Sequence, residues 1–207
     1  MPTRVYLLRH GESADPTVFH GAESDIGLSQ RGREQAEAVA AYLAGVRPHV
    51  LISSAMRRAR DSALPIAGAC GLTLIEEPDL HERRVGAMSG MPFARTEGIW
   101  PQTLARWTAG QTDYAPPGAE SFDDVKRRVL AVWERITATH RDKTLVVVAH
   151  GFVCKVLLIT LLELFPIADW NRIGPIRNLA ITELLNEGNG WRALRVNDEV
   201  ARCGHDS

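Results

Sequence analysis

The chain has 207 residues, of which 45% are hydrophobic and 24% charged, and this composition excludes a largely disordered protein. Its 24 lysines and arginines nearly balance its 25 acidic residues, for a net charge of −1. We therefore expect no nucleic-acid partner that binds through a basic surface and no polybasic membrane anchor. Three cysteines without a CxxC pair, and apolar runs too short to span a bilayer, predict a cytoplasmic protein.

The first half of the chain alternates predicted strands with predicted helices. Three short aliphatic runs are typical of strands: Val5–Leu8, Val50–Ile52 and, as an edge strand, Leu72–Ile75. A helix capped by Ser29 is expected to end near Gly45. A second helix is predicted over Met56–Cys70, and Pro65 should end it or kink it. Residues 12–28 are expected to form a loop between the first strand and the first helix.

The second half begins with a segment that has no clear periodicity. Residues 77–120 are rich in glycine, proline and tryptophan, and we interpret them as a long functional loop with some helix around Thr96–Trp107. Ser121 opens the clearest helix, because apolar residues follow it at helical spacing. An apolar helix is expected to end near Leu164. Three more strands are predicted: Leu145–Ala149, Ala180–Leu185 and Trp191–Val196.

This order of elements predicts an α/β fold, with a mostly parallel sheet covered by helices on both faces in a three-layer α/β/α sandwich. A length of 207 residues favours a single domain over 1–207. Two of the predicted strands end in the same dipeptide, at His10-Gly11 and at His150-Gly151. Since ligands bind beyond the carboxyl ends of parallel strands, we expect the two histidines at one edge of the sheet.

The residues around these strand ends favour phosphoryl chemistry. Arginine carries a fixed charge on a planar fork that matches phosphate oxygens, and Arg9 and Arg58 both follow predicted strands. A neutral imidazole such as that of His10 can attack phosphorus directly. Glu82, in the loop after the third strand, could protonate the departing oxygen.

Several stretches of the sequence resemble the histidine phosphatase superfamily, which has the phosphoglycerate mutase-like fold. Leu8–Ser13 (LRHGES) is similar to the RHGE-S/T signature of that family. Five further stretches resemble its motifs in the same order along the chain: Asp25–Ala36, Ser53–Ala63, Leu80–Gly90, Gly118–Val129 and Val146–Gly151. They follow one another in the family's order from residue 8 to residue 151, and this order over most of the chain makes the resemblance specific.

The resemblance implies a role for each matching residue. His10 would be the phosphorylated nucleophile and Glu82 the proton donor, then the base for the attacking water. Four residues would bind the phosphate: Arg9, Arg58, His150 and Ser13. Arg58 aligns with the family position, whereas Arg57 is expected to be exposed. The family needs neither metal nor other cofactor, its substrates include small phosphomonoesters, and residues of about 77–120 would form its helical or loop cap.

Some positions depart from the family pattern. Pro16 stands where many members have an asparagine, and Lys155 where an arginine is common. Val85 and Phe93 replace a tyrosine and a lysine that the related mutases use to hold phosphoglycerate. We therefore favour a phosphatase over a cofactor-dependent phosphoglycerate mutase, because lost polar partners are costly to specificity.

Other interpretations of these residues stay open at this point. The two histidines could be polar residues at strand ends, and Glu82 could be a surface acid paired with Arg83 or Arg84. Ser13 could simply cap a turn. A non-catalytic module that binds a phosphorylated ligand is the alternative from another functional class. A homodimer is possible, with Trp170 and the segment Phe165–Ile173 either at its surface or inside the chain.

Overall fold

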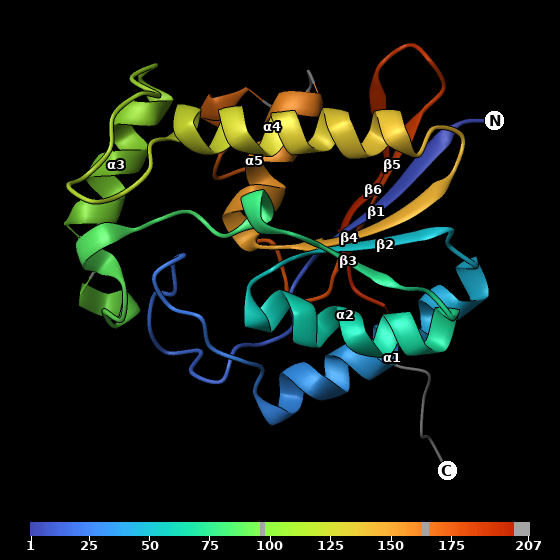
Figure 1. The fold of residues 1–207 in the computed structure, drawn as a ribbon. Helices are drawn as coiled ribbons and strands as arrows, with labels where there is room; N and C mark the ends of the chain where they lie inside the picture. Colours follow the sequence, from blue (N-terminus) through green and yellow to red (C-terminus); the bar gives the residue numbers. More distant parts are fainter. Residues whose placement is uncertain (96–97, 163–165, 201–207) are drawn as a thin grey trace.

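The computed structural model describes residues 1–95, 98–162 and 166–200, and its centre is a six-stranded sheet with the order β3-β2-β4-β1-β5-β6 (Figure 1). The strands are β1 (Thr3–Arg9), β2 (Val50–Ser54), β3 (Leu74–Glu77), β4 (Thr144–Ala149), β5 (Ile181–Asn186) and β6 (Trp191–Asp198). Strands β1 to β4 run parallel, while β5 pairs antiparallel with β1 and β6 antiparallel with β5. The predicted mostly parallel sheet is confirmed, and its centre is β4, as the aliphatic run Leu145–Ala149 indicated.

Helices cover both faces of the sheet, which confirms the predicted three-layer α/β/α sandwich (Figure 1). Helices α1 (Gln30–Val46) and α2 (Arg57–Cys70) pack on one face, and α4 (Phe122–Thr139) and α5 (Gly151–Leu161) on the other. Helix α3 (Ile99–Thr108) lies beside this sandwich, away from the sheet.

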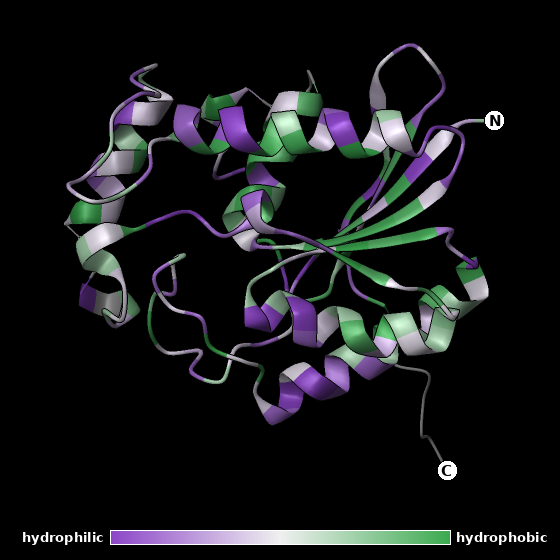
Figure 2. Ribbon diagram, viewed as in Figure 1, coloured by the Kyte–Doolittle hydropathy of each residue, from purple (hydrophilic) through white to green (hydrophobic). Residues whose placement is uncertain are grey.

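The alternation of side chains along the strands divides the core into two halves. Val5 and Leu7 face α4 and α5, whereas Tyr6 and Leu8 face α1 and α2, because successive side chains of a strand point to opposite faces. The same alternation holds along β4, whose residues are almost fully buried on both sides. Figure 2 accordingly shows the central strands as the most continuous hydrophobic part of the ribbon.

The predicted helix starts are confirmed at the two serine caps. The Ser29 hydroxyl accepts a hydrogen bond from the Gly32 amide at 2.9 Å. Ser121 and Asp124 form a capping box, in which each side chain bonds to the backbone amide of the other residue. Such caps satisfy amides that have no partner inside the helix, and each contributes about 1 kcal/mol.

Two sequence expectations about α2 and β3 need correction. Helix α2 does not end at Pro65 but continues to Cys70. Its buried face, which includes Ala59, Ala63 and Ile66, packs in the core beneath the sheet, and this packing outweighs the one backbone hydrogen bond that a proline removes. Strand β3 starts at Leu74, two residues later than predicted, and it lies at the edge of the sheet as expected.

The segment between β3 and α4 is mostly irregular, as predicted for residues 77–120. Its described residues form three short 3₁₀ turns and α3, which covers the expected helix from Ile99 onward; Thr96 lies outside the described residues. Trp107 is fully buried and Trp170 only 5% exposed, and the two rings pack together 6.2 Å apart. Trp170 therefore lies inside the chain, while Phe165 falls outside the described residues.

Helix α5 ends at Leu161 in the structure, and Leu164 lies outside the described residues. In the described part of the chain, none of the helices combines the length and the apolar character needed to cross a bilayer.

Candidate active site

The carboxyl ends of β1, β2 and β4 converge on a cavity of about 520 Å³, a size typical of sites for small ligands. His10 directly follows β1, and His150 directly follows β4. Because these strands are parallel neighbours, the two imidazoles meet edge to face with ring centres 5.2 Å apart. The expectation that both histidines share one edge of the sheet is confirmed.

His10 is held in one orientation by its own loop. Its Nδ1 lies 2.6 Å from the Gly11 carbonyl oxygen, and its Nε2 lies 3.2 Å from the Arg58 Nε, which donates to it. A carbonyl can only accept, so Nδ1 carries the proton and Nε2 keeps its lone pair. Burial, reinforced by the charges of Arg9 and Arg58, holds the His10 pKa well below its usual range, so the ring is neutral at pH 7.

Arg58, in the first turn of α2, reaches over the His10 ring. Its two terminal nitrogens donate to the backbone carbonyls of Ser24 at 2.7 Å and Gly21 at 3.3 Å, both in the loop between β1 and α1. The side chain is 1% exposed, whereas its neighbour Arg57 is exposed to solvent. This contrast confirms the expectation that Arg57 would be the exposed member of the pair.

His150 is oriented by β2. Its Nε2 lies 2.9 Å from the Ser54 hydroxyl, and its Nδ1 is buried without a partner among the described residues. When Ser54 donates to Nε2, Nδ1 carries the proton and can donate to a ligand. Burial and the nearby charge of Arg58 keep the His150 pKa well below its usual range, so this ring too is neutral at pH 7.

Arg9, the last residue of β1, supplies a further buried donor. One terminal nitrogen donates to the Ile176 carbonyl at 2.7 Å, but its Nε is buried and has no partner within the described part of the chain. A buried donor without an acceptor is unfavourable by about 1–3 kcal/mol. The unpartnered nitrogens of Arg9 and His150 are therefore suited to an anion that enters the cavity.

Glu82 lines the same cavity from the segment after β3. Its Oε1 accepts from the Arg83 amide at 2.9 Å, and its Oε2 accepts from the Phe152 amide at 3.3 Å in the first turn of α5. Its side chain thus has partners on the backbone, and the alternative of a surface pair with the Arg83 or Arg84 side chain finds no support in the structure.

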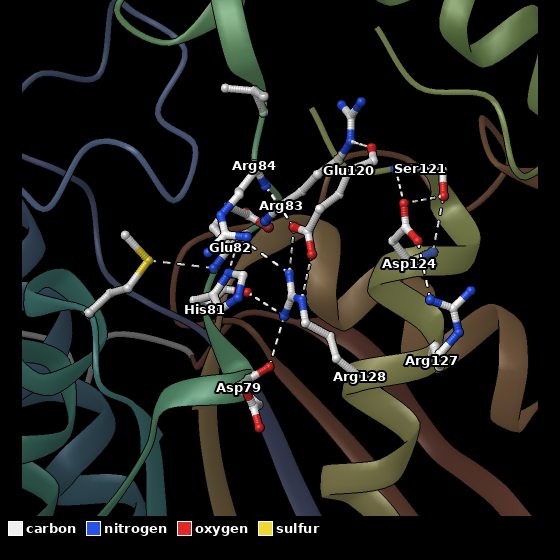
Figure 3. Close-up of polar contacts among 12 residues, drawn as sticks. Asp79, His81, Glu82, Arg83, Arg84, Glu120, Ser121, Asp124, Arg127 and Arg128 are labelled. Carbon is white, nitrogen blue, oxygen red and sulfur yellow. Dashed lines mark hydrogen bonds and ion pairs between the residues drawn. The ribbon is translucent and has the colours of Figure 1, made fainter. Parts of the chain in front are cut away.

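Arg128 of α4 fixes the segment that carries Glu82, and sequence analysis did not identify it. It forms a two-pronged ion pair with Glu120, at 2.8 and 3.0 Å, and donates to the carbonyls of Asp79, His81 and Glu82 (Figure 3). The Glu120 pKa is lowered because Arg128 donates to that carboxylate against the opposing effect of burial. Arg128 is a positioning residue for Glu82.

Ser13 and Pro16, in the loop between β1 and α1, both line the cavity. The Ser13 hydroxyl donates to the Asp15 carbonyl at 3.3 Å, which is the contact of a turn cap. Pro16 lies beside it in the place of a polar donor. Whether Ser13 contacts phosphate stays a prediction. In the part of the chain that the structure describes, no group of three or more His, Cys, Asp or Glu residues is arranged to hold a metal ion.

Two more positioning residues brace His10 from distant parts of the chain. The Asn178 side chain donates to the His10 carbonyl at 2.8 Å. The Ser62 hydroxyl accepts from the Gly11 amide at 2.9 Å and donates to the Arg58 carbonyl. Ser62 falls within a recognised motif, but no sequence signal marks Asn178, because only the folded chain brings residue 178 to residue 10.

The fold and this cluster define an α/β protein whose strand ends bring imidazoles and arginines together beside one cavity. The sequence profile of the histidine phosphatase superfamily (branch 1) matches residues 5–199. The chain belongs to this superfamily, as its motifs indicated.

Several named proteins are similar to the chain. Glucosyl-3-phosphoglycerate phosphatase of Mycobacterium tuberculosis is 32% identical over 205 residues, which cover 93% of this chain and 91% of that protein. The native structure of a mycobacterial glucosyl-3-phosphoglycerate phosphatase aligns with a TM-score of 0.83 at 28% identity, over 96% of this chain and 100% of that one. A metal-independent phosphoserine phosphatase of Arabidopsis thaliana is 34% identical over 167 residues, or 78% of this chain and 69% of that protein.

Another relative is considerably longer. The bifunctional protein Rv2228c of Mycobacterium tuberculosis is 38% identical over 162 residues, and the match covers 76% of this chain but only 43% of that protein. The chain thus spans less than half the length of this relative.

Proposed function

We propose that the protein is a phosphomonoesterase that hydrolyses a small phosphorylated metabolite through a phosphohistidine on His10. The observation that carries the proposal is the state of the His10 ring. Its Nδ1 is bonded to the Gly11 carbonyl, so Nε2 is the unprotonated nitrogen; it accepts from Arg58 Nε in this structure, and His10 lines the cavity that a phosphoryl group would enter. A neutral imidazole in this tautomer is a nucleophile at neutral pH.

In the first step, His10 Nε2 attacks the phosphorus atom while the bond to the ester oxygen breaks. Glu82 would act as the general acid that gives a proton to the departing alcohol. In the second step, water attacks the phosphohistidine and Glu82, now a carboxylate, takes the proton of that water. The P–N bond breaks, inorganic phosphate leaves, and His10 returns to its neutral form.

Charge neutralisation supports both steps. Arg9, Arg58 and His150 would donate to the phosphoryl oxygens, and the unpartnered nitrogens of Arg9 and His150 are available for this contact. Positioned donors of this kind each contribute about 10²–10³-fold to the rate. Ser13 would add a donor from the loop if its hydroxyl turned away from Asp15.

Similarity to relatives supports the substrate class. The two named phosphatases that resemble the chain act, by their names, on glucosyl-3-phosphoglycerate and phosphoserine, both small phosphorylated metabolites. We place the enzyme in the cytoplasm, since Cys70 and Cys154 are free thiols, which suit a reducing compartment. Self-association stays a prediction, and nucleic acid and membranes are not expected partners.

The test is release of phosphate from a panel of small phosphomonoesters that includes 3-phosphoglycerate and p-nitrophenyl phosphate, with a metal chelator present. We expect turnover that resists the chelator and falls at least about 10⁴-fold in His10→Ala. Trapping of phosphate on His10, detected by intact mass after acid-free quenching, would accompany it. Isomerisation of 3-phosphoglycerate without phosphate release would instead identify a mutase, and turnover that survives His10→Ala would contradict the proposal.

A further inference from the structure

Part of the cavity wall is built from aromatic rings. Trp100 comes from α3, Phe152 from α5 and Trp170 from the segment after it, and all three line the cavity. Phe152 and Trp170 lie with ring centres 5.1 Å apart, and Trp100 lies 6.4 Å from Phe152 and 6.0 Å from Trp170. Such a wall excludes water and strengthens any charge interaction beside it.

Arg83 is buried in this aromatic wall with most of its donors unused. The centre of its guanidinium lies 4.9 Å from the Trp107 ring centre, 5.4 Å from Phe152 and 5.7 Å from Trp100. The side chain is 1% exposed. Its Nε donates to the Glu120 carbonyl at 2.7 Å, but both terminal nitrogens are buried without a partner among the described residues.

Figure 3 shows that the Arg83 side chain takes no part in the neighbouring contacts between Arg128 and Glu120. Its one drawn contact goes to the Glu120 carbonyl, and its terminal nitrogens point away from the pair formed by Arg128 and Glu120. Burial lowers the Arg83 pKa to about 10, which leaves the side chain charged at pH 7. A buried cation with two unused donor groups is unfavourable unless an anion reaches it.

Nearby carboxylates do not fill these donors. Glu82, Glu120 and Glu23 are the acids whose charges act most strongly on Arg83. Glu82 accepts from two backbone amides, Glu120 binds Arg128, and Glu23 accepts from the amides of Val85 and Gly86. Each acid is thus engaged elsewhere, although its charge still helps Arg83 to remain protonated.

Lys155 is the second cation of this wall. It lies on α5, is 7% exposed and lines the cavity. Its Nζ lies 4.4 Å from the centre of the Trp170 ring, and it donates no hydrogen bond to a residue that the structure describes. Burial lowers its pKa to about 8. Arg83 and Lys155 thus contact different rings of one connected aromatic cluster, and each has donor groups without an acceptor among the described residues.

We propose that Arg83 and Lys155 bind a second anionic group of the substrate, a carboxylate, so that the preferred substrates are phosphate esters of small carboxylic acids. The inference rests on the proposed function, because it assigns the far end of the same cavity. Two neighbouring guanidinium nitrogens match the two oxygens of a carboxylate, and the lysine adds a third donor. The desolvation that both cations have undergone in the free protein makes their pairing with an anion stronger than at a surface.

The experiment compares esters that differ only in the carboxylate. O-phosphoserine is compared with O-phosphoethanolamine, and 3-phosphoglycerate with glycerol 3-phosphate. In the wild type we expect kcat/KM to favour the carboxylated member of at least one pair about ten-fold or more. Arg83→Met should reduce that ratio toward one, chiefly by raising KM for the carboxylated ester, and Lys155→Met should reduce it in the same direction.

The matched control is Arg84→Met, since Arg84 is the adjacent arginine and its side chain is exposed. It should keep the wild-type ratio. A wild type without preference for the carboxylate, or an Arg83→Met enzyme that keeps the preference, would overturn the proposal. An equal fall for both members of a pair would assign Arg83 a structural role and would also overturn it.

Two additions keep the outcome decisive. If Arg83→Met does not fold, Arg83→Lys keeps the charge and removes the fork, and the same ratio is measured. Calorimetric binding of 3-phosphoglycerate and of glycerol 3-phosphate reports the preference without turnover. Hydrolysis of p-nitrophenyl phosphate that depends on His10 would uphold the proposed function even if the carboxylate preference were absent, so the two failures are distinguishable.

Discussion

The two ends of the cavity are built differently. At the phosphate end, His10 and His150 follow the ends of adjacent parallel strands, and backbone carbonyls or hydroxyls orient both rings and Arg58. At the far wall, Arg83 and Lys155 lie among aromatic rings with few or no polar partners among the described residues. Under the proposed function, the first end binds the phosphoryl group, which all phosphomonoesters share. The second end would contact the rest of the substrate, which differs from one ester to another. We therefore expect the residues of that end to determine which esters the enzyme prefers.

The largest effect should come from removing the guanidinium at the phosphate end. Arg58→Gln is expected to lower kcat/KM about 10²–10³-fold on every ester, because it removes a charged donor beside the reacting atoms. Arg57→Gln is the matched control, since its side chain is exposed and pairs with Asp61. Steady-state kinetics on p-nitrophenyl phosphate decides the point. Equal effects of the two substitutions would remove Arg58 from the phosphate site.

The rigidity of the phosphate end can be tested through a glycine of α1. A Cβ at Gly32 would lie 2.2 Å from the Glu12 carbonyl oxygen, which is backbone and cannot move aside cheaply. Gly32→Ala should therefore lower the free energy of unfolding by about 3 kcal/mol.

Gly45→Ala in the same helix is the control, because no described atom lies within 4 Å of the position that a Cβ would take there. It should be neutral or stabilising by up to about 1 kcal/mol. Urea unfolding measures the stability of both variants. A Gly32→Ala protein as stable as the wild type would show that the backbone around Glu12 can shift at little cost, which would contradict the rigidity of this end.

The orientation of His150 gives a smaller effect. Ser54→Ala removes the hydroxyl that bonds to Nε2 and should lower kcat about ten-fold, the kinetic equivalent of roughly one hydrogen bond. Ser53→Ala is the control, because the neighbouring hydroxyl bonds to the Ser54 carbonyl instead. Nitrogen chemical shifts of the His150 ring report its tautomer directly. A changed tautomer only in Ser54→Ala would sharpen the assignment, and unchanged kinetics would contradict it.

A last prediction concerns the charge state of the two histidines. Both have pKa values well below the unfolded value of about 6.5, so between these pKa values the unfolded chain binds more protons than the folded one. Their stabilising contribution is therefore complete above pH 6.5 and is lost as the pH falls below it. The expected slope is at most about 1.4 kcal/mol per pH unit for each ring.

Ring carbon-bound proton signals measured by NMR from pH 8 to pH 5 test this directly. The signals of His10 and His150 should not titrate near pH 6.5. Midpoints near pH 6.5 would mean that His10 is partly cationic at neutral pH. They would contradict the view that the strand-end residues hold His10 as a neutral nucleophile.

Local patterns predicted the framework closely. The serine caps, the central strand β4 and the meeting of His10 with His150 all follow from nearby residues and from the rule for parallel strands. Pro65 does not end α2, because a helix packed against a sheet tolerates a proline that a helix in isolation does not; a kink at Pro65 stays a prediction.

The residues of the site that the sequence did not predict were missed for one physical reason. Asn178 and Arg128 act through contacts with residues far away in the sequence, and their types are compatible with ordinary surface or core roles. Arg83 was considered only as an ion-pair partner of Glu82. Its unused donors became visible only when three aromatic rings from other segments closed around it.

The contacts of residues 176 and 178 with Arg9 and His10 have a consequence for biosynthesis. These pairs are separated by 167 and 168 positions along the chain. A growing polypeptide that already contains all of the proposed reacting residues therefore still lacks the groups that hold the N-terminal pair in place. Contacts of such long sequence separation form late and slow the search for the native state. We expect a ribosome-bound chain to become active only after residue 178 has left the exit tunnel.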